Sequence, residues 1–453
     1  METLKLSEIA TAVGSTVAID GEITEISTDT RTIPNGCLFV AIKGENFDGH
    51  DYIPMAFDKG AKAVITEKYV QGYNCIVVEN TRKALLDIAR FYRKKFDINL
   101  VGVTGSVGKT TTKEMIALVL SEKYNTLKTT GNLNNEIGLP KTLFGLNKSH
   151  ECAVIEMGMS HFGEISRLTQ TALPTMAVIT NIGFSHIENL GSQQGILKAK
   201  LEILEGMDGS APIFLNADDI SLYQTSYQLG RETITFGIEN PDSDFRATNI
   251  QQFKDYTTFT VNWKDNTQDV LLSTIGKHNV LNALVSFAIG IKLNLTPTEI
   301  CNALKKFKSD KLRQNIIQKG EQTLIIDCYN ASPDSMKASL NVLSQTNPKG
   351  EGRRIAVLGD MLELGDMSER LHSMVGDFAG QSKADTLFCY GKEAQNIGRV
   401  ALTYGKEVQF FTDKQLLNSA LKDFLQPNDV VLFKASRGMK LEDTINNIYD
   451  GKD

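Results

Sequence analysis

The most regular pattern along the chain is a series of short apolar, β-branched runs that alternate with stretches of helical periodicity. One such run, at 98–105, leads into a glycine turn and then into helical periodicity over 111–124. Strands of this kind, separated by helices, are typical of a largely parallel sheet with helices on both faces. We therefore predict an α/β domain over 98–309. Its further strands are expected at 153–158, 176–183 and 211–217.

The last part of this region has a different pattern. Polar and apolar residues alternate in three runs between about 231 and 275, which predicts antiparallel strands attached to the parallel sheet. A predicted helix from Asn279 to about Lys292 follows them.

Two further domains are predicted on either side. Residues 1–97 mix short apolar runs, such as 37–42 and 63–67, with turn-forming clusters, which is typical of a small α/β domain. Residues 310–453 again alternate strands with helices and predict a doubly wound, Rossmann-like domain. The expected fold class is thus α/β in three domains. The C-terminal strands are expected at 323–329, 353–360, 385–391, 408–412 and 429–436.

The composition is that of a globular protein without an overall excess of positive charge. Of 453 residues, 41% are hydrophobic and 23% charged, and the formal net charge is −6, which argues against binding to nucleic acid or to an anionic membrane surface. The six cysteines form no CxxC pair, and no apolar run reaches the length of about 18 residues that a membrane span needs. We expect reduced thiols, no signal peptide, no membrane insertion and a cytoplasmic protein.

The strongest local signal is a glycine-rich loop, Gly102–Thr111, between a predicted strand and a predicted helix. Its backbone N–H groups can surround phosphates, Lys109 can reach the β- and γ-phosphates, and the Thr110 hydroxyl can bind Mg²⁺. Val103 stands where the strict GxxxxGK[ST] spacing has its first glycine. A glycine turn with an incidental lysine is the alternative, but the strand–loop–helix context favours ATP or GTP binding. The candidate phosphate-binding residues are Gly105, Ser106, Val107, Gly108, Lys109, Thr110 and Thr111.

Two polar side chains follow predicted strands of the same sheet. Glu156 lies in the run 153–158, and His186 comes just after the run 176–183. Open α/β sheets bind ligands at these carboxyl ends, so either residue could bind a metal beside the phosphate loop. A lone Glu or His in such a place is more often a helix cap or a satisfied polar group, and the residues alone leave both interpretations open.

Lys200 has an unusual position in a predicted helix. Its neighbours three and four residues away are all apolar, whereas Lys198 has Gln194 and Glu202 four residues away. Desolvation lowers the pKa of a lysine and favours a neutral amine that can react with CO₂ to give a metal-binding carbamate. A lysine whose stem packs while its head reaches water is the plainer alternative.

Further segments complete a recognisable set: TGSVGKTT at 104–111, TGNLNNEIGLP at 130–140, EMGM at 156–159, TNIGFSH at 180–186, GKHNVLN at 276–282 and DCYNASPDSM at 327–336. In this order, and together with Lys200, they resemble the Mur ligases of peptidoglycan synthesis. The resemblance covers the whole chain and implies an ATP-dependent ligase that uses Mg²⁺, with Lys109, Lys200 and His186 as catalytic residues. It implies Thr110, Glu156, His186 and a carbamate on Lys200 as metal ligands, and Asn279, Asn282, Arg313 and Asp327 as contacts to ATP.

Within the family, the segments 329–336 and 357–365 and His372 resemble the member that adds D-alanyl-D-alanine to UDP-N-acetylmuramoyl-tripeptide through an acyl phosphate. The Asp-Asn-Pro-Arg tetrapeptide expected in the ligase that adds the third residue does not occur. Two positions depart from the family pattern: Leu312 replaces a common glycine, and Cys328 stands where Asp or Ser is usual.

The resemblance assigns the UDP-sugar to 1–97, ATP to 98–309 and the dipeptide to 310–453. Turn residues that merely shape a small domain remain the alternative for the N-terminal set. The implied substrate residues are Thr30, Arg31, Lys43, Gly44, Asp48, Gly49 and His50, then Asn132, Asn134 and Asn135, and finally Tyr329, Asn330 and Ser335.

Two other functions stay open. A folylpolyglutamate-synthase-like ligase shares the phosphate loop, but the extended N-terminal domain argues against it. A P-loop regulatory NTPase needs neither the third α/β domain nor the Lys200 helix. We expect a monomer.

Overall fold

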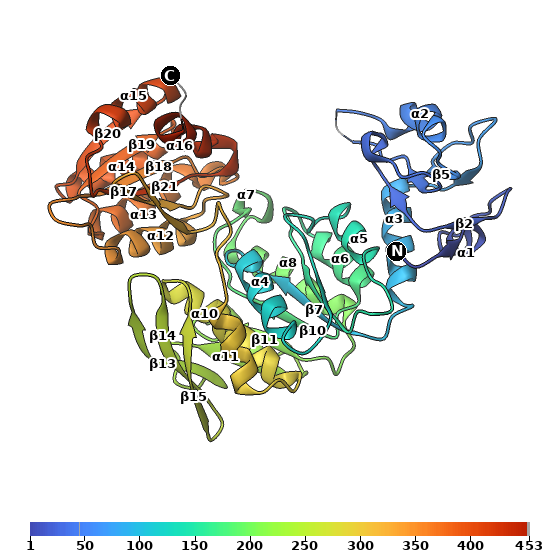
Figure 1. Ribbon diagram of the computed structural model, residues 1–453, viewed down its shortest axis with the longest axis horizontal. Helices are drawn as coiled ribbons and strands as arrows, with labels where there is room; N and C mark the ends of the chain where they lie inside the picture. Colours follow the sequence, from blue (N-terminus) through green and yellow to red (C-terminus); the bar gives the residue numbers. More distant parts are fainter. Residues whose placement is uncertain (45, 451–453) are drawn as a thin grey trace.

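The computed structural model describes residues 1–44 and 46–450, and its three units follow one another along the chain, with the N-terminal and C-terminal units at opposite ends of the molecule (Figure 1). Glu45, next to the candidate residue Gly44, lies outside the described part. The predicted fold class is confirmed, because two large, mainly parallel sheets follow a small α/β unit.

The N-terminal unit contains a four-stranded parallel sheet in the order β3-β4-β5-β6 and a separate antiparallel pair, β1 and β2. Helix α3 anchors it to the rest of the chain, because Tyr92 donates a hydrogen bond to the Leu146 carbonyl (2.6 Å) and Arg93 donates one to the Ala172 carbonyl (3.0 Å). The elements are β1 (Leu4–Lys5), α1 (Leu6–Ala12), β2 (Glu22–Ile23), β3 (Ile26–Ser27), β4 (Leu38–Val40), α2 (Ile53–Asp58), β5 (Ala63–Thr66), β6 (Cys75–Val77) and α3 (Thr81–Arg93).

The central unit is built on a nine-stranded sheet in the order β15-β14-β13-β12-β11-β10-β7-β9-β8. Its elements are β7 (Asn99–Thr104), α4 (Lys109–Leu120), β8 (Thr126–Lys128), α5 (Gly138–Leu143), β9 (Cys152–Glu156), α6 (Glu164–Ala172), β10 (Met176–Ile179), α7 (Ile187–Leu190), α8 (Gln193–Leu201), β11 (Ile213–Asn216), α9 (Ile220–Ser226), β12 (Thr233–Gly237), β13 (Phe245–Gln252), β14 (Thr257–Trp263), β15 (Asn266–Leu272), α10 (Lys277–Lys292) and α11 (Pro297–Lys305).

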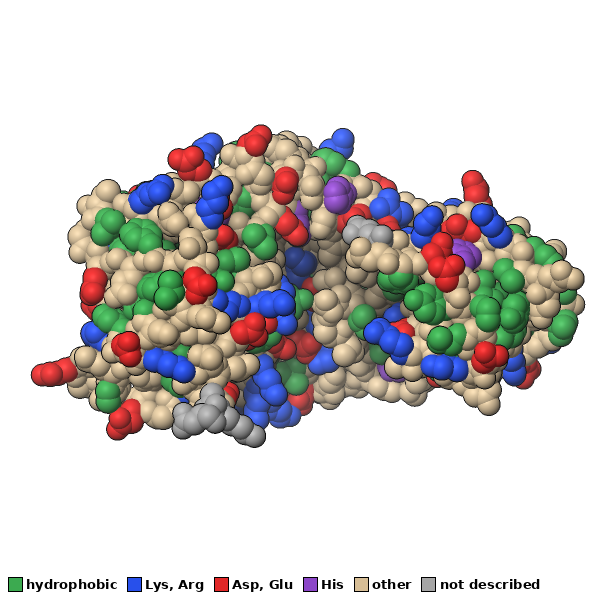
Figure 2. Space-filling model, turned by 90° about the horizontal axis from the view of Figure 1, so that it is seen from above, with side chains coloured by type: hydrophobic (Ala, Val, Ile, Leu, Met, Phe, Trp, Pro, Cys, Tyr) green, Lys and Arg blue, Asp and Glu red, His purple; other side chains and the backbone are tan. Residues whose placement is uncertain are grey.

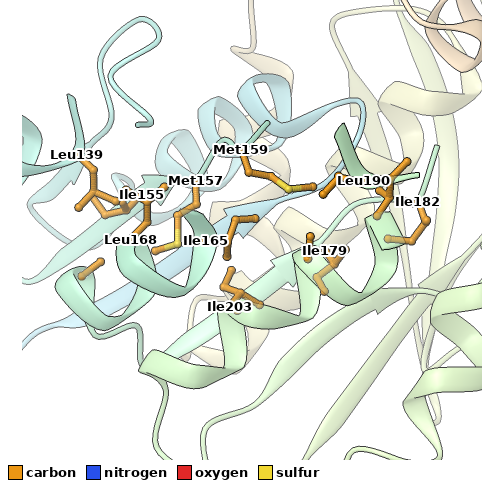
Figure 3. Packing of buried hydrophobic residues seen from close by; sticks show 14 of the residues in the cluster. Leu139, Ile155, Met157, Met159, Ile165, Leu168, Ile179, Ile182, Leu190 and Ile203 are labelled. Atoms are coloured by element: carbon orange, nitrogen blue, oxygen red, sulfur yellow. The ribbon is translucent and has the colours of Figure 1, made fainter. Parts of the chain in front are cut away.

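Successive residues of the buried central strands face two different cores. Val101 and Val103 belong to the cluster formed with α4, α10 and α11. On the other face, Ile155 and Ile179 pack with residues of α6 and the segment after α8 (Figure 3). Because both faces are covered, these strands are apolar throughout, and their carboxyl ends meet along one edge of the sheet.

One prediction for this unit is wrong in part. The run at 232–238 forms β12, which pairs in parallel with β11, and only β13, β14 and β15 pair antiparallel to one another. Helix α9 returns the chain from the end of β11 to the start of β12, so β12 enters the sheet in the same direction. Alternating polarity indicates a strand at the periphery of a sheet but does not fix its direction.

The C-terminal unit has a six-stranded sheet in the order β16-β17-β21-β18-β19-β20, parallel except for β16. All five predicted strands are present, and the partly exposed edge strand β16 was missed because its pattern is weak. The elements are β16 (Asn315–Lys319), β17 (Gln322–Ile326), α12 (Pro333–Gln345), β18 (Arg354–Gly359), α13 (Ser368–Gln381), β19 (Thr386–Tyr390), α14 (Ala394–Thr403), β20 (Glu407–Phe411), α15 (Lys414–Phe424), β21 (Val430–Lys434) and α16 (Leu441–Tyr449).

A buried carboxylate holds the start of β18 beside β21. Asp429 is fully buried and accepts hydrogen bonds from the Arg353 backbone (2.9 Å), the Arg353 guanidinium (2.8 Å) and the Gln426 backbone (2.9 Å). We expect Asp429→Ala to destabilise this unit by about 3 kcal/mol, because the donors lose their acceptor. Thermal unfolding measures this, with the exposed Asp443→Ala as control; an unchanged midpoint for Asp429→Ala would contradict the assigned role.

All six cysteines are free thiols, as their scattered positions predict. None of the helices in the described part of the chain combines the length and apolar character that crossing a membrane requires.

Candidate active site

A cavity of about 470 Å³ lies between the central and C-terminal units. The surface view in Figure 2 shows the molecule hollowed in its middle, between the parts that carry the two ends of the chain. The cavity lies at the carboxyl ends of the parallel central strands, where open α/β sheets bind ligands. The candidate residues that line it are Ser106, Val107, Gly108, Lys109, Thr110, Thr111, Asn134, Asn135, Glu156, His186, Asn279, Asn282, Arg313, Asp327, Tyr329, Asn330 and Ser335.

The glycine-rich loop turns between β7 and α4 and is held by the segment that follows β10. Asn181 accepts a hydrogen bond from the Val107 N–H (2.9 Å), and Thr180 donates one to the Val107 carbonyl (2.6 Å). Gly105 has a φ of +149°, and a Cβ there would lie 1.8 Å from Thr180 Oγ1; Gly108 has a φ of +87°. Both positions therefore require glycine, and the loop leads directly into the N-terminus of a helix, which is a phosphate-binding geometry.

Lys109 is the first residue of α4, and its side chain folds back over this loop. Its Nζ donates hydrogen bonds to the carbonyls of Gly105 (2.7 Å) and Ser106 (3.3 Å). Burial lowers the pKa of Lys109, Glu156 raises it, Arg313 lowers it further, and the net shift is downward. A bound polyanion would remove this penalty, because it supplies the negative charge that the buried ammonium lacks.

Glu156 ends β9 with a buried carboxylate that is only half satisfied. Its Oε1 accepts a hydrogen bond from Asn134 Nδ2 (2.8 Å). Its Oε2 is buried, 3.9 Å from Lys113 Nζ, and has no hydrogen-bond partner in the part of the chain that the structure describes. A carboxylate oxygen left free in this way suits a hard cation such as Mg²⁺. No three His, Cys, Asp or Glu side chains gather into a metal cluster within 1–44 and 46–450.

His186 caps the short helix α7 and faces the C-terminal unit. Its Nδ1 lies 2.6 Å from Glu363 Oε2, outside the direction that a hydrogen bond requires. Contact with His186 lowers the pKa of the Glu363 carboxyl, although partial burial raises it. The candidate metal ligand is thus in contact with the facing unit, which couples this edge of the cavity to the position of that unit.

The contrast predicted between the two lysines of α8 is confirmed. Lys200 is 2% exposed, whereas Lys198 is exposed. Burial, together with the nearby charge of Lys109, lowers the pKa of Lys200 well below its ordinary value. The neutral amine that carbamate formation requires is therefore favoured at this position. Lys200 is not among the residues that line the cavity itself.

One cavity wall joins α10 of the central unit to the C-terminal unit. Asn282 accepts a hydrogen bond from Thr112 (3.0 Å) and donates one to Asn279 Oδ1 (3.3 Å). Arg313 stacks its guanidinium on the Tyr329 ring, 3.8 Å from the ring centroid. The candidate ATP residues Asn279, Asn282, Arg313 and Asp327 all line the same cavity.

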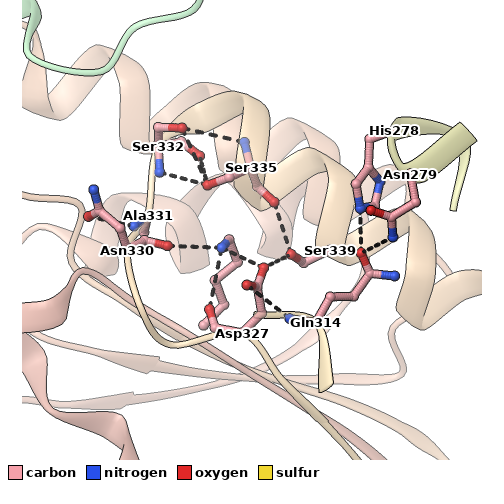
Figure 4. Close-up of polar contacts among 10 residues, drawn as sticks. His278, Asn279, Gln314, Asp327, Asn330, Ala331, Ser332, Ser335 and Ser339 are labelled. Atoms are coloured by element: carbon pink, nitrogen blue, oxygen red, sulfur yellow. Dashed lines mark hydrogen bonds and ion pairs between the residues drawn. The ribbon is translucent and has the colours of Figure 1, made fainter. Parts of the chain in front are cut away.

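The part of the cavity wall that the C-terminal unit contributes is held by a buried ion pair. Lys434, 1% exposed at the end of β21, donates hydrogen bonds to Asp327 Oδ2 (2.7 Å) and to the Asn330 carbonyl (3.0 Å). Ser339 also donates to Asp327 (2.5 Å) (Figure 4). Burial raises the pKa of Asp327, but the Lys434 charge and the hydrogen bonds outweigh it and lower the pKa overall. These contacts fix the loop that presents Tyr329 and Asn330 to the cavity.

The remaining candidate residues lie elsewhere. In the N-terminal unit, the Asp48 side chain accepts a hydrogen bond from His50 Nδ1 (2.6 Å), and Lys43 bridges to Asp48 along the backbone. Arg31 pairs with Asp29 (2.7 Å) at the surface. The candidates that do not line the cavity are Thr30, Arg31, Lys43, Gly44, Asp48, Gly49 and His50, together with Gly105, Asn132 and Lys200.

Sequence reasoning missed three residues of the site. Lys113 is fully buried and donates to the Thr129 carbonyl (2.7 Å) beside Glu156, and its position one helical turn after Lys109 could have indicated it. Lys434 follows the apolar run of β21, at a strand end where ligands bind. Nothing in the local sequence indicated Gln314, because its hydrogen-bond partners belong to the central unit and reach it only when the two units pack together.

Three family models match the chain in order. The model described as "Mur ligase family, catalytic domain" matches residues 22–93, the "Mur ligase middle domain" matches residues 103–290, and the "Mur ligase, glutamate ligase domain" matches residues 312–437.

Individual proteins match over nearly the whole length. A UDP-N-acetylmuramoyl-tripeptide–D-alanyl-D-alanine ligase of Bacillus subtilis is 39% identical over 432 residues, which cover 94% of this chain and 93% of that protein. A crystal structure of MurF from Acinetobacter baumannii superposes with a TM-score of 0.92 at 30% identity and covers 100% of both chains. The MurF ligase of Thermotoga maritima, solved in complex with ADP, has a TM-score of 0.85 at 31% identity and covers 94% of this chain and 97% of that one.

Proposed function

The chain belongs to the Mur ligase family, and we propose that it uses ATP to join D-alanyl-D-alanine to UDP-N-acetylmuramoyl-tripeptide, releasing ADP and phosphate. The observation that carries this proposal is the single cavity in which the phosphate loop of the central unit faces the Tyr329–Asn330 loop of the C-terminal unit. The matched family models and similar proteins do not favour the two alternatives, a folylpolyglutamate-synthase-like ligase and a regulatory NTPase.

The first step would activate the terminal carboxylate of the tripeptide. A carboxylate is a poor electrophile, so one of its oxygens attacks the γ-phosphorus of ATP, and the bond to ADP breaks to give an acyl phosphate. Lys109, at the start of α4, would move from the loop carbonyls to the phosphoryl oxygens and offset the charge that grows there. Mg²⁺ held by Thr110, Glu156, His186 and a carbamate on Lys200 would supply further positive charge.

The second step would form the amide bond. The amine of D-alanyl-D-alanine attacks the acyl carbon to give a tetrahedral intermediate, which collapses to the amide with loss of phosphate and of a proton from the nitrogen. No covalent enzyme intermediate is needed, since positioning and electrostatics suffice. The loop that Lys434 fixes would present Tyr329 and Asn330, with Ser335 nearby on α12, to the dipeptide.

The N-terminal unit would bind the UDP end of the acceptor through Thr30, Arg31, Lys43, Gly44, Asp48, Gly49 and His50, and Asn132, Asn134 and Asn135 would guide its peptide. An acyl phosphate hydrolyses in water, so the C-terminal unit would close over the cavity. We further propose that the enzyme works in the cytoplasm as a monomer.

The test is an omission experiment. Purified protein is mixed with ATP, Mg²⁺, UDP-N-acetylmuramoyl-tripeptide and D-alanyl-D-alanine, each component is left out in turn, and phosphate release and product mass are measured. We expect release that needs every component and a product with the mass of the pentapeptide. Release that is indifferent to the amine or to the sugar nucleotide would refute the proposed reaction.

A further inference from the structure

Gln314 lies where the central and C-terminal units join. Its backbone belongs to the C-terminal unit, because β16 begins at the next residue and its N–H donates to Asp327 Oδ1 (3.3 Å). Its side chain instead enters the central unit and is buried, with the residue only 8% exposed. One residue therefore spans the boundary between the two units that form the cavity.

The side-chain amide of Gln314 makes hydrogen bonds from both ends. Its Oε1 accepts from Asn279 Nδ2 (3.1 Å) and bonds to His278 Nε2 (Figure 4). Its Nε2 donates to the Ile275 carbonyl (2.8 Å). All three contacts lie at the N-terminus of α10. Gln314 also has a φ of 46°, a conformation that costs energy for a residue with a Cβ and persists only where surrounding contacts fix it.

These contacts determine the state of two side chains that line the cavity. A glutamine Oε1 can only accept, so His278 must donate from Nε2, which leaves its Nδ1 as an acceptor. Burial lowers the pKa of His278, although the Gln314 contact and the Asp327 charge raise it, and the net shift is downward, which favours the neutral ring. Asn279 has its amide nitrogen held by Gln314 and by the Ile275 carbonyl (2.9 Å), and its Oδ1 is held by Asn282.

We infer that Gln314 is a positioning residue for the nucleotide: its amide fixes His278 and Asn279 in the orientation that binds ATP, and only while the C-terminal unit is docked. This rests on the proposed function for the identity of the ligand. Because the same residue holds Asp327 through its backbone, nucleotide binding and the placement of the C-terminal unit are coupled through it.

The experiment compares three substitutions in the full-length protein. Gln314→Met keeps the volume but removes every side-chain hydrogen bond, Gln314→Ala removes the packing as well, and Gln314→Glu keeps an oxygen that can accept from His278 and Asn279. The matched control is Gln318→Met, an exposed residue of the same segment whose Oε1 accepts a hydrogen bond from Thr323 (3.2 Å). ADP binding is measured by calorimetry, and KM and kcat are measured for each substrate.

We expect Gln314→Met and Gln314→Ala each to weaken ADP binding and to raise KM for ATP about tenfold, because buried donors of His278 and Asn279 lose their acceptor. KM for D-alanyl-D-alanine should change less than twofold, Gln314→Glu should recover part of the affinity, and Gln318→Met should match the wild type. If Gln314 acts by packing alone, Gln314→Met should have the ADP affinity and the KM for ATP of the wild type, and that result would overturn the inference.

The two proposals can fail separately. If the wild-type enzyme makes the pentapeptide but Gln314→Met binds ADP with unchanged affinity, the proposed role of Gln314 is refuted and the proposed reaction is not. A wild type that binds ADP without making the pentapeptide refutes the reaction, and the affinity comparison still decides the role of Gln314. Melting temperatures within a few degrees of wild type exclude misfolding as the cause.

Discussion

Lys109→Ala is expected to abolish ATP-dependent ligation while leaving the fold intact. Lys109 is the cation of the phosphate loop and lies at the start of α4. Its Nζ donates hydrogen bonds to two loop carbonyls, and it can donate to phosphate oxygens instead when ATP binds. In a buried site, loss of a charge aimed at the transferring phosphoryl group costs about 10³-fold in rate. The effect is measured as kcat/KM for ATP in the phosphate-release assay.

The fold should tolerate this substitution, because Lys109 forms no ion pair with a carboxylate among residues 1–44 and 46–450, and burial disfavours its charge. We expect an unfolding midpoint at or slightly above that of the wild type. The control is Lys123→Ala, an exposed lysine just after the same helix that donates a hydrogen bond to the Asn294 carbonyl (2.7 Å). Near-normal turnover in Lys109→Ala would refute its assignment to the phosphate site.

Lys200→Ala is expected to lose at least about 100-fold in activity and to regain part of it when acetate or formate is added. If Nζ reacts with CO₂, an N–C bond forms, a proton is released to solvent, and the cation becomes an anion that can bind Mg²⁺. Burial and the Lys109 charge lower the pKa of Lys200 and so supply the neutral amine for this reaction. A small carboxylate can occupy the space of the missing carbamate, which is why recovery is expected.

Two measurements separate this chemistry from a structural role for Lys200. Wild-type protein in ¹³C-bicarbonate should show a carbamate carbon by NMR that Lys200→Ala lacks, and CO₂-depleted buffer should lower wild-type activity. Lys198→Ala, on the exposed side of the same helix, should behave as wild type in each assay. Absence of both the carbamate signal and the carboxylate rescue would leave Lys200 as a buried structural lysine.

The sequence alone was sufficient for features that depend on near neighbours in the chain. The phosphate loop combines the end of a strand, two glycines that need positive φ and a helix N-terminus within a short stretch of chain, Gly102–Thr111, so the sequence pattern alone reveals it. The burial of Lys200 and the exposure of Lys198 follow from residues three and four places away on one helix. The order of strands and helices likewise determined the fold class.

Only the tertiary structure decided which distant residues meet. Lys434 and Asp327 are 107 residues apart in the chain, and Gln314 and Asn279 are 35 apart on different units. The direction of β12 also depended on where α9 returned the chain to the sheet. Such contacts arise from the packing of whole units. Packing buries a lysine or a glutamine, and a buried polar group must form hydrogen bonds or ion pairs. The hydrophobic periodicity of a single helix or strand does not predict which distant residue supplies them.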